Sequence, residues 1–550
     1  MLTSLAFIAF YYFSYFCGRG ILIIIESKSK VNLKDSSLFN IPIKIFSPIV
    51  YIFYIGNLVL IFNFFSGFNF LTYLLGIFPI FFNFKAHRKL EINKYLFFYK
   101  NITLLILGLS SNTIYFHQDS ASYHLSNQLF IRSEKIVLGL ANLHVRYGFS
   151  SISEYINSFF WFNDNFLLLH FVNLIFVATF FIFLLNITVE FEKNKLRVFF
   201  ILVTLFAIFD NFGIEGGKNG YFDIDSIGKQ DTAFAIIFFF ANFFIIQGFI
   251  NTKTFNPKEF LFIQFFVLFS LQLKIFGFTA LIGLFIFIIK NKKFVKLKHF
   301  TISSILGLIW IMKNYLVSSC LVFPVSISCL PSKWFHEGFA KSQNAELREF
   351  HKAYDFINQN IFQWYENWSS RYLNYYISIN LFVSFSLLLI VGVILYKKRN
   401  NFVKVNQLSF LYITLLFFTW LISSPTIRFG YGIFLVLILI ISNLFEIERS
   451  QIIKNIINKK ITFLSLYLFA VVSTPLFNNY DLTFFISPLR EIRPEIIKYT
   501  KNLDNWGYSV SNNENQDIEF CWINKNCIPP SKYKILEDNL NNYRLIYVEK

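Results

Sequence analysis

The chain alternates between long apolar runs and short polar segments over most of its length. Because about 20 apolar residues cross a bilayer as a helix, we interpret the runs as about fourteen membrane spans. They lie near residues 3–25, 45–65, 68–84, 95–115, 165–188, 196–210, 230–250, 259–273, 275–290, 299–317, 373–396, 406–424, 426–445 and 460–475. Lys274 divides the region 259–290, which favours two short helices with a polar tip over one long tilted helix. The pattern predicts an all-α polytopic membrane protein with about 12–14 transmembrane helices.

Lys and Arg gather in the short segments between the runs. These basic loops lie at residues 28–34, 85–94, 290–298, 397–399 and 454–460. Cytoplasmic loops of membrane proteins carry such an excess of basic residues. With the N-terminus outside, alternation of the spans puts every basic loop in the cytoplasm. The same alternation puts the four long polar segments outside, at 116–160, 211–229, 318–370 and 475–550. We expect a multi-pass protein of the bacterial inner (plasma) membrane, with its long loops and C-terminus in the periplasm.

Composition agrees with this interpretation. The 550 residues are 55% hydrophobic and only 15% charged, which is too much apolar surface for a soluble domain to bury. The net charge of +18 would suit a nucleic-acid partner, but Lys and Arg crowd into short loops and the four long polar segments are each close to neutral. We therefore expect contact with the lipid bilayer and no nucleic acid. After a transmembrane domain spanning 1–475, the polar tail 476–550 has strand-like stretches at 507–511 and 543–549. It predicts a small extracytoplasmic α/β domain.

Four of the five cysteines form two close pairs, Cys320 with Cys329 and Cys521 with Cys527, while Cys17 lies in the first span. Both pairs fall in segments that the charge pattern places outside. Because disulfides persist in oxidising compartments, we expect two short disulfide loops; four unrelated thiols are the alternative. Neither pair has the second pair of ligands that a structural zinc site needs.

Candidate chemistry concentrates in the first long polar segment. Asp119 directly follows a span, and Tyr123 and His124 come next. A carboxylate at a membrane edge is either a solvated loop charge or a general base. If residues 120–131 form a short interfacial helix, Asp119 and His124 face one cavity. His124 and His144 are either hydrogen-bonded loop histidines or weak candidates for metal ligands.

Cationic residues at the outer ends of spans suggest an anionic ligand. Residues 139–149 (GLANLHVRYGF) suit a well-defined loop or a pair of short helices, and Arg146 offers a planar donor fork that fits phosphate. Lys274 and Arg428 lie at two further outer ends, where snorkelling to lipid headgroups is the alternative role. Asp231 caps the following span in solvent, helps to bind a metal or orients a sugar hydroxyl.

Taken together, these segments resemble the GT-C class of membrane glycosyltransferases, including protein mannosyltransferases and the aminoarabinose transferase of lipid A. The chain is more closely similar to a bacterial family of GT-C-like polytopic proteins. The similarity covers most of the chain. It rests on the segments DSASYHL, GLANLHVRYGF, LQLKIFG, NYLVSSCLVFPVSISCLPSKWF, SPTIRFGYG and FCWINKNCIPP. Leu138 and Val145 depart from the family pattern, since they stand where Pro and Gly are expected.

The resemblance implies a GT-C fold and gives Asp119 the role of general base or acceptor-orienting carboxylate. It also implies a sugar donor linked to polyprenyl phosphate and a glycan or lipid acceptor, with inversion at the anomeric carbon. A divalent metal, Mg²⁺ or Mn²⁺, assists some members of the class, and the sequence leaves that role open here.

Three functions remain open at this stage. The first is a membrane glycosyltransferase that acts on the periplasmic face. The second is a transporter or flippase of lipid-linked glycans or another solute, which would favour inverted repeats and polar mid-membrane helices. The third is an assembly component without catalysis. Because the polar residues gather in outer segments and at span edges, we favour the glycosyltransferase.

Overall fold

The computed structural model describes the following residues: 2–29, 37–38, 41–85, 94–112, 114–117, 119–149, 151–162, 165–190, 199–203, 224, 226–228, 230–250, 257–291, 297–336, 338, 341, 360, 362–363, 366, 404–423, 427–444, 460–476 and 535–548. Several predictions lie outside these residues. They are the span 373–396, most of the span 196–210, the strand-like stretch 507–511 and the Cys521/Cys527 pair.

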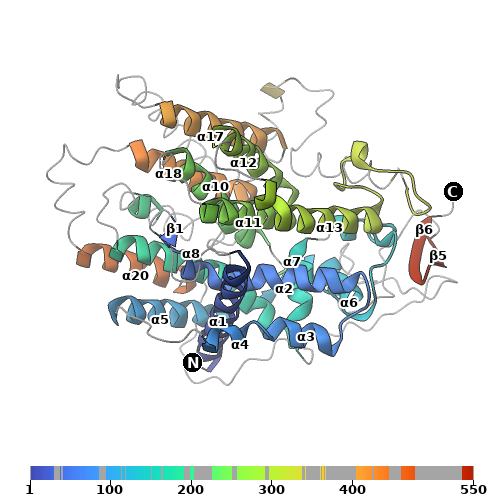
Figure 1. Ribbon diagram of the computed structural model, residues 1–550, viewed down its shortest axis with the longest axis horizontal. Helices are drawn as coiled ribbons and strands as arrows, with labels where there is room; N and C mark the ends of the chain where they lie inside the picture. Colours follow the sequence, from blue (N-terminus) through green and yellow to red (C-terminus); the bar gives the residue numbers. More distant parts are fainter. Residues whose placement is uncertain are drawn as a thin grey trace.

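The described chain is mostly helical (Figure 1). Its first half contains α1 (Leu2–Ser29), α2 (Ser47–Asn63), α3 (Phe70–Ile77), α4 (Ile80–Lys85), α5 (Lys94–Leu109), α6 (Leu125–Ser133), α7 (Ile152–Phe159) and α8 (Leu167–Glu190). Its second half contains α10 (Asp231–Ile250), α11 (Pro257–Leu273), α12 (Phe278–Lys290), α13 (Thr301–Ser318), α17 (Lys404–Ser423), α18 (Ile427–Leu444) and α20 (Lys460–Leu476). Strands β5 (Ile535–Leu540) and β6 (Tyr543–Val548) form an antiparallel hairpin near the C-terminus.

The apolar runs correspond closely to these helices. Lys274 separates α11 from α12, so the region 259–290 forms two helices and not one. The run 68–84 differs from a single span, because it is divided into α3 and α4 at Pro79. A proline lacks a backbone N–H and restricts the residue before it, so it interrupts a helix at this point.

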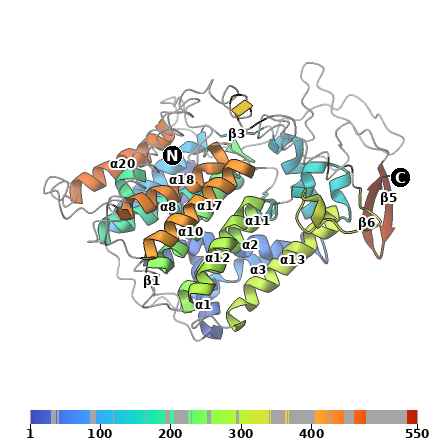
Figure 2. The same cartoon turned by 90° about the horizontal axis from the view of Figure 1, so that it is seen from above.

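Among the described residues, five apolar helices are long enough to cross a membrane by length and composition, and several shorter apolar helices accompany them. The long ones are Leu2–Ser27, Ile43–Asn63, Leu167–Ile187, Asp231–Phe249 and Thr301–Ser318. Their burial differs strongly: the apolar window of Asp231–Phe249 is 94% buried, whereas that of Thr301–Ser318 is only 17% buried. Helix α10 therefore lies at the centre of the bundle and α13 at its periphery (Figure 2).

Phenylalanine rings fill the interior between these helices. Phe46 packs with near-perpendicular rings against Phe240, Phe244 and Phe266, at centroid distances of 5.0, 5.6 and 5.4 Å. Edge-to-face pairs at such distances add stabilisation beyond the burial of area alone. The abundance of Phe therefore serves a close-packed aromatic core that joins α8, α10 and α11.

Several helix ends meet at the segment 116–160. The Asn63 amide, at the end of α2, donates to the carbonyls of Ile131 and Glu134 at 3.2 and 2.9 Å. The Ser151 hydroxyl donates to the carbonyl of Leu273, the last residue of α11, at 2.7 Å. At the other end of the bundle, Lys290 donates to the Phe249 carbonyl at 2.7 Å and joins α12 to α10. The ends of α2 and α11 thus lie beside the polar segment, and Lys290 lies at the other end of the bundle.

The C-terminal hairpin packs on this polar end (Figure 1). The Leu138 N–H donates to the Arg544 carbonyl, and the Ile546 N–H donates to the Leu138 carbonyl, both at 2.9 Å. The Asn142 amide donates to the carbonyls of Trp334 and Ile546, at 2.9 and 3.0 Å. Residues distant in sequence are therefore held as one layer over the helix ends.

Candidate functional site

A short parallel strand pair begins the polar layer. Tyr115–Phe116 (β3) pairs with Ser226–Ile227 (β4), and the His117 N–H donates to the Ile227 carbonyl at 3.0 Å. Gly228 follows at a φ of +96°, and a Cβ there would lie 2.0 Å from the Ser120 hydroxyl oxygen. Only glycine fits such a conformation and such a contact. This close approach brings the start of α10 beside η3, a π-helical turn spanning Ser120–His124.

Glu154 is the centre of the buried hydrogen bonds in this layer. It lies in α7 with only 2% of its surface exposed. One carboxylate oxygen contacts His124 Nδ1 and accepts from the Gln230 amide at 2.9 Å, while the other accepts from the Gln128 amide at 2.8 Å. The carbonyl oxygen of the Gln128 side chain in turn accepts from the Trp161 indole N–H at 2.7 Å. A buried carboxylate is stable when donors satisfy its oxygens, as they do here.

The Glu154 carboxylate also sets the charge of His124. Burial favours the neutral imidazole, but the adjacent carboxylate outweighs it and raises the pKa of His124 above its ordinary value. The pair therefore favours an imidazolium facing a carboxylate. Because both groups are buried, they are suited to fixing the geometry of η3 against α7.

Asp119 has a different environment from Glu154. Its carboxylate lies 3.2 Å from His117 Nδ1, and its side chain is 44% exposed. The backbone N–H of Asp119 also donates to His117 Nδ1, at 3.2 Å. A carboxylate that is held on one side and open on the other can accept a proton from an incoming hydroxyl group.

Tyr123, His144 and Arg146 gather beside this pair. The Tyr123 ring lies 4.2 Å from the His124 ring and 5.7 Å from the His144 ring, between centroids. Burial and the nearby Asp119 carboxylate raise the pKa of Tyr123, so its phenol stays protonated. Burial and the Arg146 guanidinium lower the pKa of His144 to about 3. The Nδ1 atom of His144 accepts a hydrogen bond from the backbone N–H of Arg146 at 3.1 Å. His144 is therefore a neutral acceptor, and Arg146 carries the positive charge here.

The expected loop or short helix pair at 139–149 consists of two 3₁₀ helices. They are η4 (Leu140–Asn142) and η5 (Val145–Phe149). Gly139 precedes η4 at a φ of +69°, which glycine adopts without steric cost. Arg146 lies in η5, with its guanidinium carbon 6.0 Å from the centroid of the Phe149 ring.

Asp231 and Lys274 form an ion pair at the edge of the same layer. The Lys274 ammonium contacts Asp231 Oδ1, and the two side chains are 23% and 12% exposed. The pair joins the first residue of α10 to the corner between α11 and α12. Lys274 thus has its own carboxylate, so its charge is shared between that partner and any anionic ligand.

Arg428 lies in the first turn of α18, and its side chain is outside the described residues. Its backbone position is informative. A Cβ at Gly432, one turn further on, would lie 3.1 Å from the Ala235 carbonyl of α10. Because Ala235 is one turn from Asp231, the first turns of α18 and α10 lie at the same end of the bundle.

The cysteines and the metal question can be stated for the described residues. Cys320 and Cys329 are joined by a disulfide, and Cys17 is a buried free thiol. Within the described ranges, no three His, Cys, Asp or Glu side chains are grouped so that they could hold a metal ion.

Sequence reasoning missed Glu154, Gln128, Gln230 and Lys313. The stretch from Ser151 to Glu154 has the form S-x-x-E, which predicts a glutamate that reaches back to the start of its own helix. Glu154 instead turns into the polar layer, while Ser151 caps α7. Lys313 of α13 is fully buried, with its ammonium 3.6 Å from the centroid of the Trp310 ring. For Lys313, the available signal was a charged residue inside an apolar run.

Comparison with known proteins identifies a family. The sequence model of a family described as "Domain of unknown function (DUF8201)" matches residues 1–435. The chain therefore belongs to this family. Neither the curated proteins nor the solved structures contain a significant match to the chain.

Proposed function

We propose that this member of the DUF8201 family is an integral membrane glycosyltransferase of GT-C type. It transfers a sugar from a polyprenyl-phosphate-linked donor to a cell-envelope acceptor, at the periplasmic face of the bacterial inner membrane. The observation that carries the proposal is the arrangement of charge. Asp119, Arg146, Asp231 and Lys274 gather at one end of an apolar helical bundle, opposite the end where Lys290 joins α12 to α10.

The surface of the bundle supports the membrane location. Large apolar side chains are exposed on its peripheral helices, including Phe70 on α3, Phe81 on α4 and Leu308 on α13. Contiguous apolar surface on this scale is unfavourable in water and favourable against lipid. Since nucleotide sugars are cytoplasmic, a donor for the opposite face has to arrive attached to lipid.

Asp119 is the proposed general base. The acceptor hydroxyl attacks the anomeric carbon while its proton passes to the Asp119 carboxylate. The bond between that carbon and the phosphate oxygen breaks, and the electron pair leaves with the polyprenyl phosphate. A base within hydrogen-bond reach of the attacking hydroxyl contributes about 10²–10⁴-fold to such a step. His117 Nδ1 accepts the Asp119 backbone N–H at 3.2 Å and so fixes the backbone that carries this base.

Cationic groups stabilise the leaving phosphate in this proposal. The Arg146 guanidinium is a planar donor that matches phosphate oxygens, and the neutral phenol of Tyr123 is a second donor close by. Lys274 and Arg428 complete the positive edge. Stabilising charge that develops on a leaving group is among the largest single contributions to enzyme catalysis.

Complementation of a deletion strain tests the proposal. Lipid extracts and surface glycans of the deletion strain are profiled by mass spectrometry, with wild-type and Asp119→Asn genes supplied separately. We expect an accumulated lipid-linked sugar and a truncated surface glycan, corrected by the wild-type gene and not by the Asn variant. An unchanged lipid and glycan profile in the deletion strain would contradict the proposal.

The same experiment separates the transporter alternative. A flippase defect traps the lipid-linked glycan in the cytoplasmic leaflet, whereas a transferase defect leaves it in the periplasmic leaflet. Treating intact spheroplasts with a membrane-impermeant glycosidase distinguishes the two locations. We expect the accumulated sugar to be cleaved; complete protection would favour the flippase.

A further inference from the structure

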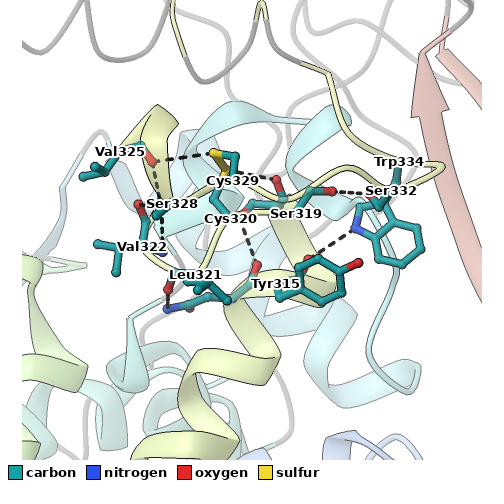
Figure 3. Close-up of a disulfide and its surroundings, with 12 residues drawn as sticks. Tyr315, Ser319, Cys320, Leu321, Val322, Val325, Ser328, Cys329, Ser332 and Trp334 are labelled. Atoms are coloured by element: carbon teal, nitrogen blue, oxygen red, sulfur yellow. Dashed lines mark hydrogen bonds between the residues drawn. A yellow bond between two sulfur atoms is a disulfide. The ribbon is translucent and has the colours of Figure 1, made fainter.

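The disulfide-closed loop that follows α13 has an unusual surface. Residues Cys320–Cys329 form a short ring, and Val322, Val325, Ile327 and Leu330 are exposed on it or directly after it. Ile327 is 93% exposed, which makes it the most exposed large apolar side chain among the described residues. In Figure 3 the labelled Val322 and Val325 lie on the opposite side of the disulfide from Trp334. An apolar tip of this kind needs an apolar environment.

The loop is rigid and satisfies much of its own backbone. Seven of its backbone N–H groups donate to acceptors in the loop or at the end of α13, namely those of Cys320, Leu321, Val322, Val325, Ser328, Cys329 and Leu330. The Ser328 hydroxyl also donates to the carbonyls of Val322 and Val325, at 2.9 and 2.7 Å. Non-helical backbone enters a lipid interface at low cost only when its polar groups are paired internally.

The neighbouring sequence carries no charge. Between Lys313 and Lys333, residues 314–332 contain no Asp, Glu, Lys or Arg. The loop continues directly from α13, where five of the exposed side chains are apolar and recur at helical spacing. These side chains are Ile302, Ile305, Leu308, Ile311 and Met312. The apolar surface of one peripheral helix thus leads along the chain into the apolar tip.

The tip fits lipid better than a protein partner. Protein interfaces are anchored by aromatic residues and Arg and have a polar rim. The exposed tip has aliphatic side chains and one hydroxyl, Ser326, and its one aromatic ring, Phe323, is buried with Cys320 against Phe149. Aliphatic side chains on a rigid, uncharged support are suited to the boundary between headgroups and acyl chains.

We infer that the loop 320–329 is a lipid-docking element that inserts its Ile327 tip into the outer leaflet. This inference rests on the membrane location in the proposed function. The loop packs on η5 through Phe323 and Phe149, whose ring centroids are 5.4 Å apart. Because Arg146 lies in η5, a loop held in the membrane also sets how far Arg146 lies from the bilayer surface. A donor phosphate carried in the lipid headgroup plane would meet Arg146 at that depth.

Depth-dependent fluorescence quenching tests the inference. An acridone amino acid is placed by amber suppression at Ile327, at Leu308 on α13 and at Asn539 on β5, and each protein is reconstituted in phosphatidylcholine vesicles. Doxyl groups at carbon 5 or carbon 12 of the lipid chain serve as quenchers. At position 327 we expect at least twofold stronger quenching by the 5-doxyl lipid than by the 12-doxyl lipid. We expect strong quenching of either kind at 308 and none at 539.

The control positions separate two failures. If position 308 is quenched and position 327 is not, the loop does not dock to lipid, while the membrane location stands. If neither position is quenched, the membrane location fails, and the proposed function fails with it. A protein with the acridone amino acid at Val325 is a second variant for the same loop. The migration of each protein in gel electrophoresis without reductant verifies that the Cys320–Cys329 disulfide is intact.

Discussion

The polar end of the molecule contains two histidine–carboxylate pairs whose environments differ. His117 and Asp119 are partly exposed, with 24% and 44% of their side chains accessible. His124 and Glu154 are buried, and two glutamine amides also donate to the Glu154 carboxylate. The two pairs lie at opposite ends of one turn of helix, η3. The difference assigns them separate roles: the open pair can meet a substrate, and the closed pair holds the open one in place.

The largest effect on activity is expected at the open pair. Asp119→Asn keeps the shape of the side chain but removes the proton acceptor, so transfer should fall by about 10²–10⁴-fold. The thermal unfolding of the purified variant should be unchanged, because the side chain is partly solvated. Glycan transfer and unfolding are measured on the same preparation. Full transfer by the Asn variant would remove Asp119 as the base.

The closed pair should respond in the opposite way. Glu154→Leu leaves the His124 imidazolium and two amide donors buried without their acceptor. Removing one partner of a buried ion pair costs about 3–5 kcal/mol, so the unfolding temperature should fall clearly. Glu154→Gln is the matched control, since it keeps the volume and one acceptor oxygen and should lose less. Equal stability of the Leu variant and the wild type would contradict a positioning role.

The Asp231–Lys274 pair should give a smaller effect. Lys274→Met and Asp231→Asn each break the same ion pair, so the double variant should be less destabilised than the sum of the two single changes. Residues in contact couple by about 0.5–3 kcal/mol in such a cycle. Donor affinity adds a second readout: Lys274→Met should raise the KM for the lipid-linked donor more than it lowers kcat. Strictly additive stabilities would show that the contact is not formed.

The smallest expected effect is on the pH dependence of stability. Two histidines, His124 and His144, change it in opposite directions. The pKa of His124 is raised in the folded state, so its contribution to stability is complete below about 6.5 and is lost as pH rises through the raised value. The pKa of His144 is lowered to about 3, so its contribution is complete above about 6.5 and is lost as pH falls toward that value. His124→Gln should flatten the alkaline side of the unfolding-temperature profile, and His144→Gln the acidic side. Matching profiles for both variants would refute these charge states.

Much of the fold could be predicted from the sequence, because the length of an apolar run and the position of a basic loop are local signals. The runs at 3–25, 165–188 and 230–250 correspond to α1, α8 and α10 with small shifts at their ends. The run 68–84 was wrong as a single span, since Pro79 divides it. The helix count of about 12–14 and the GT-C resemblance stay predictions.

The candidate site was only partly accessible. Residues 119–146 were prominent because polar side chains are rare in this chain, and the structure brings Asp119, Tyr123, His124, His144 and Arg146 close together. The pairing of histidines with carboxylates could not be predicted from the sequence. That Glu154 pairs with His124 depends on how α7 packs against η3, whereas the contact of His117 with Asp119 is local. Contacts between segments about 30 residues apart leave no local pattern in one sequence.

The sidedness of the segment 116–160 tests the central claim most directly. A single cysteine is introduced by Tyr115→Cys, at an exposed position beside Asp119, and by Lys290→Cys at the opposite end of the bundle, with the unsubstituted protein as the background control. Intact cells are treated with a membrane-impermeant maleimide. We predict labelling at position 115 without permeabilisation and at position 290 only after it. The reverse pattern would place the charged cluster among the cytoplasmic nucleotide sugars and contradict a lipid-linked donor.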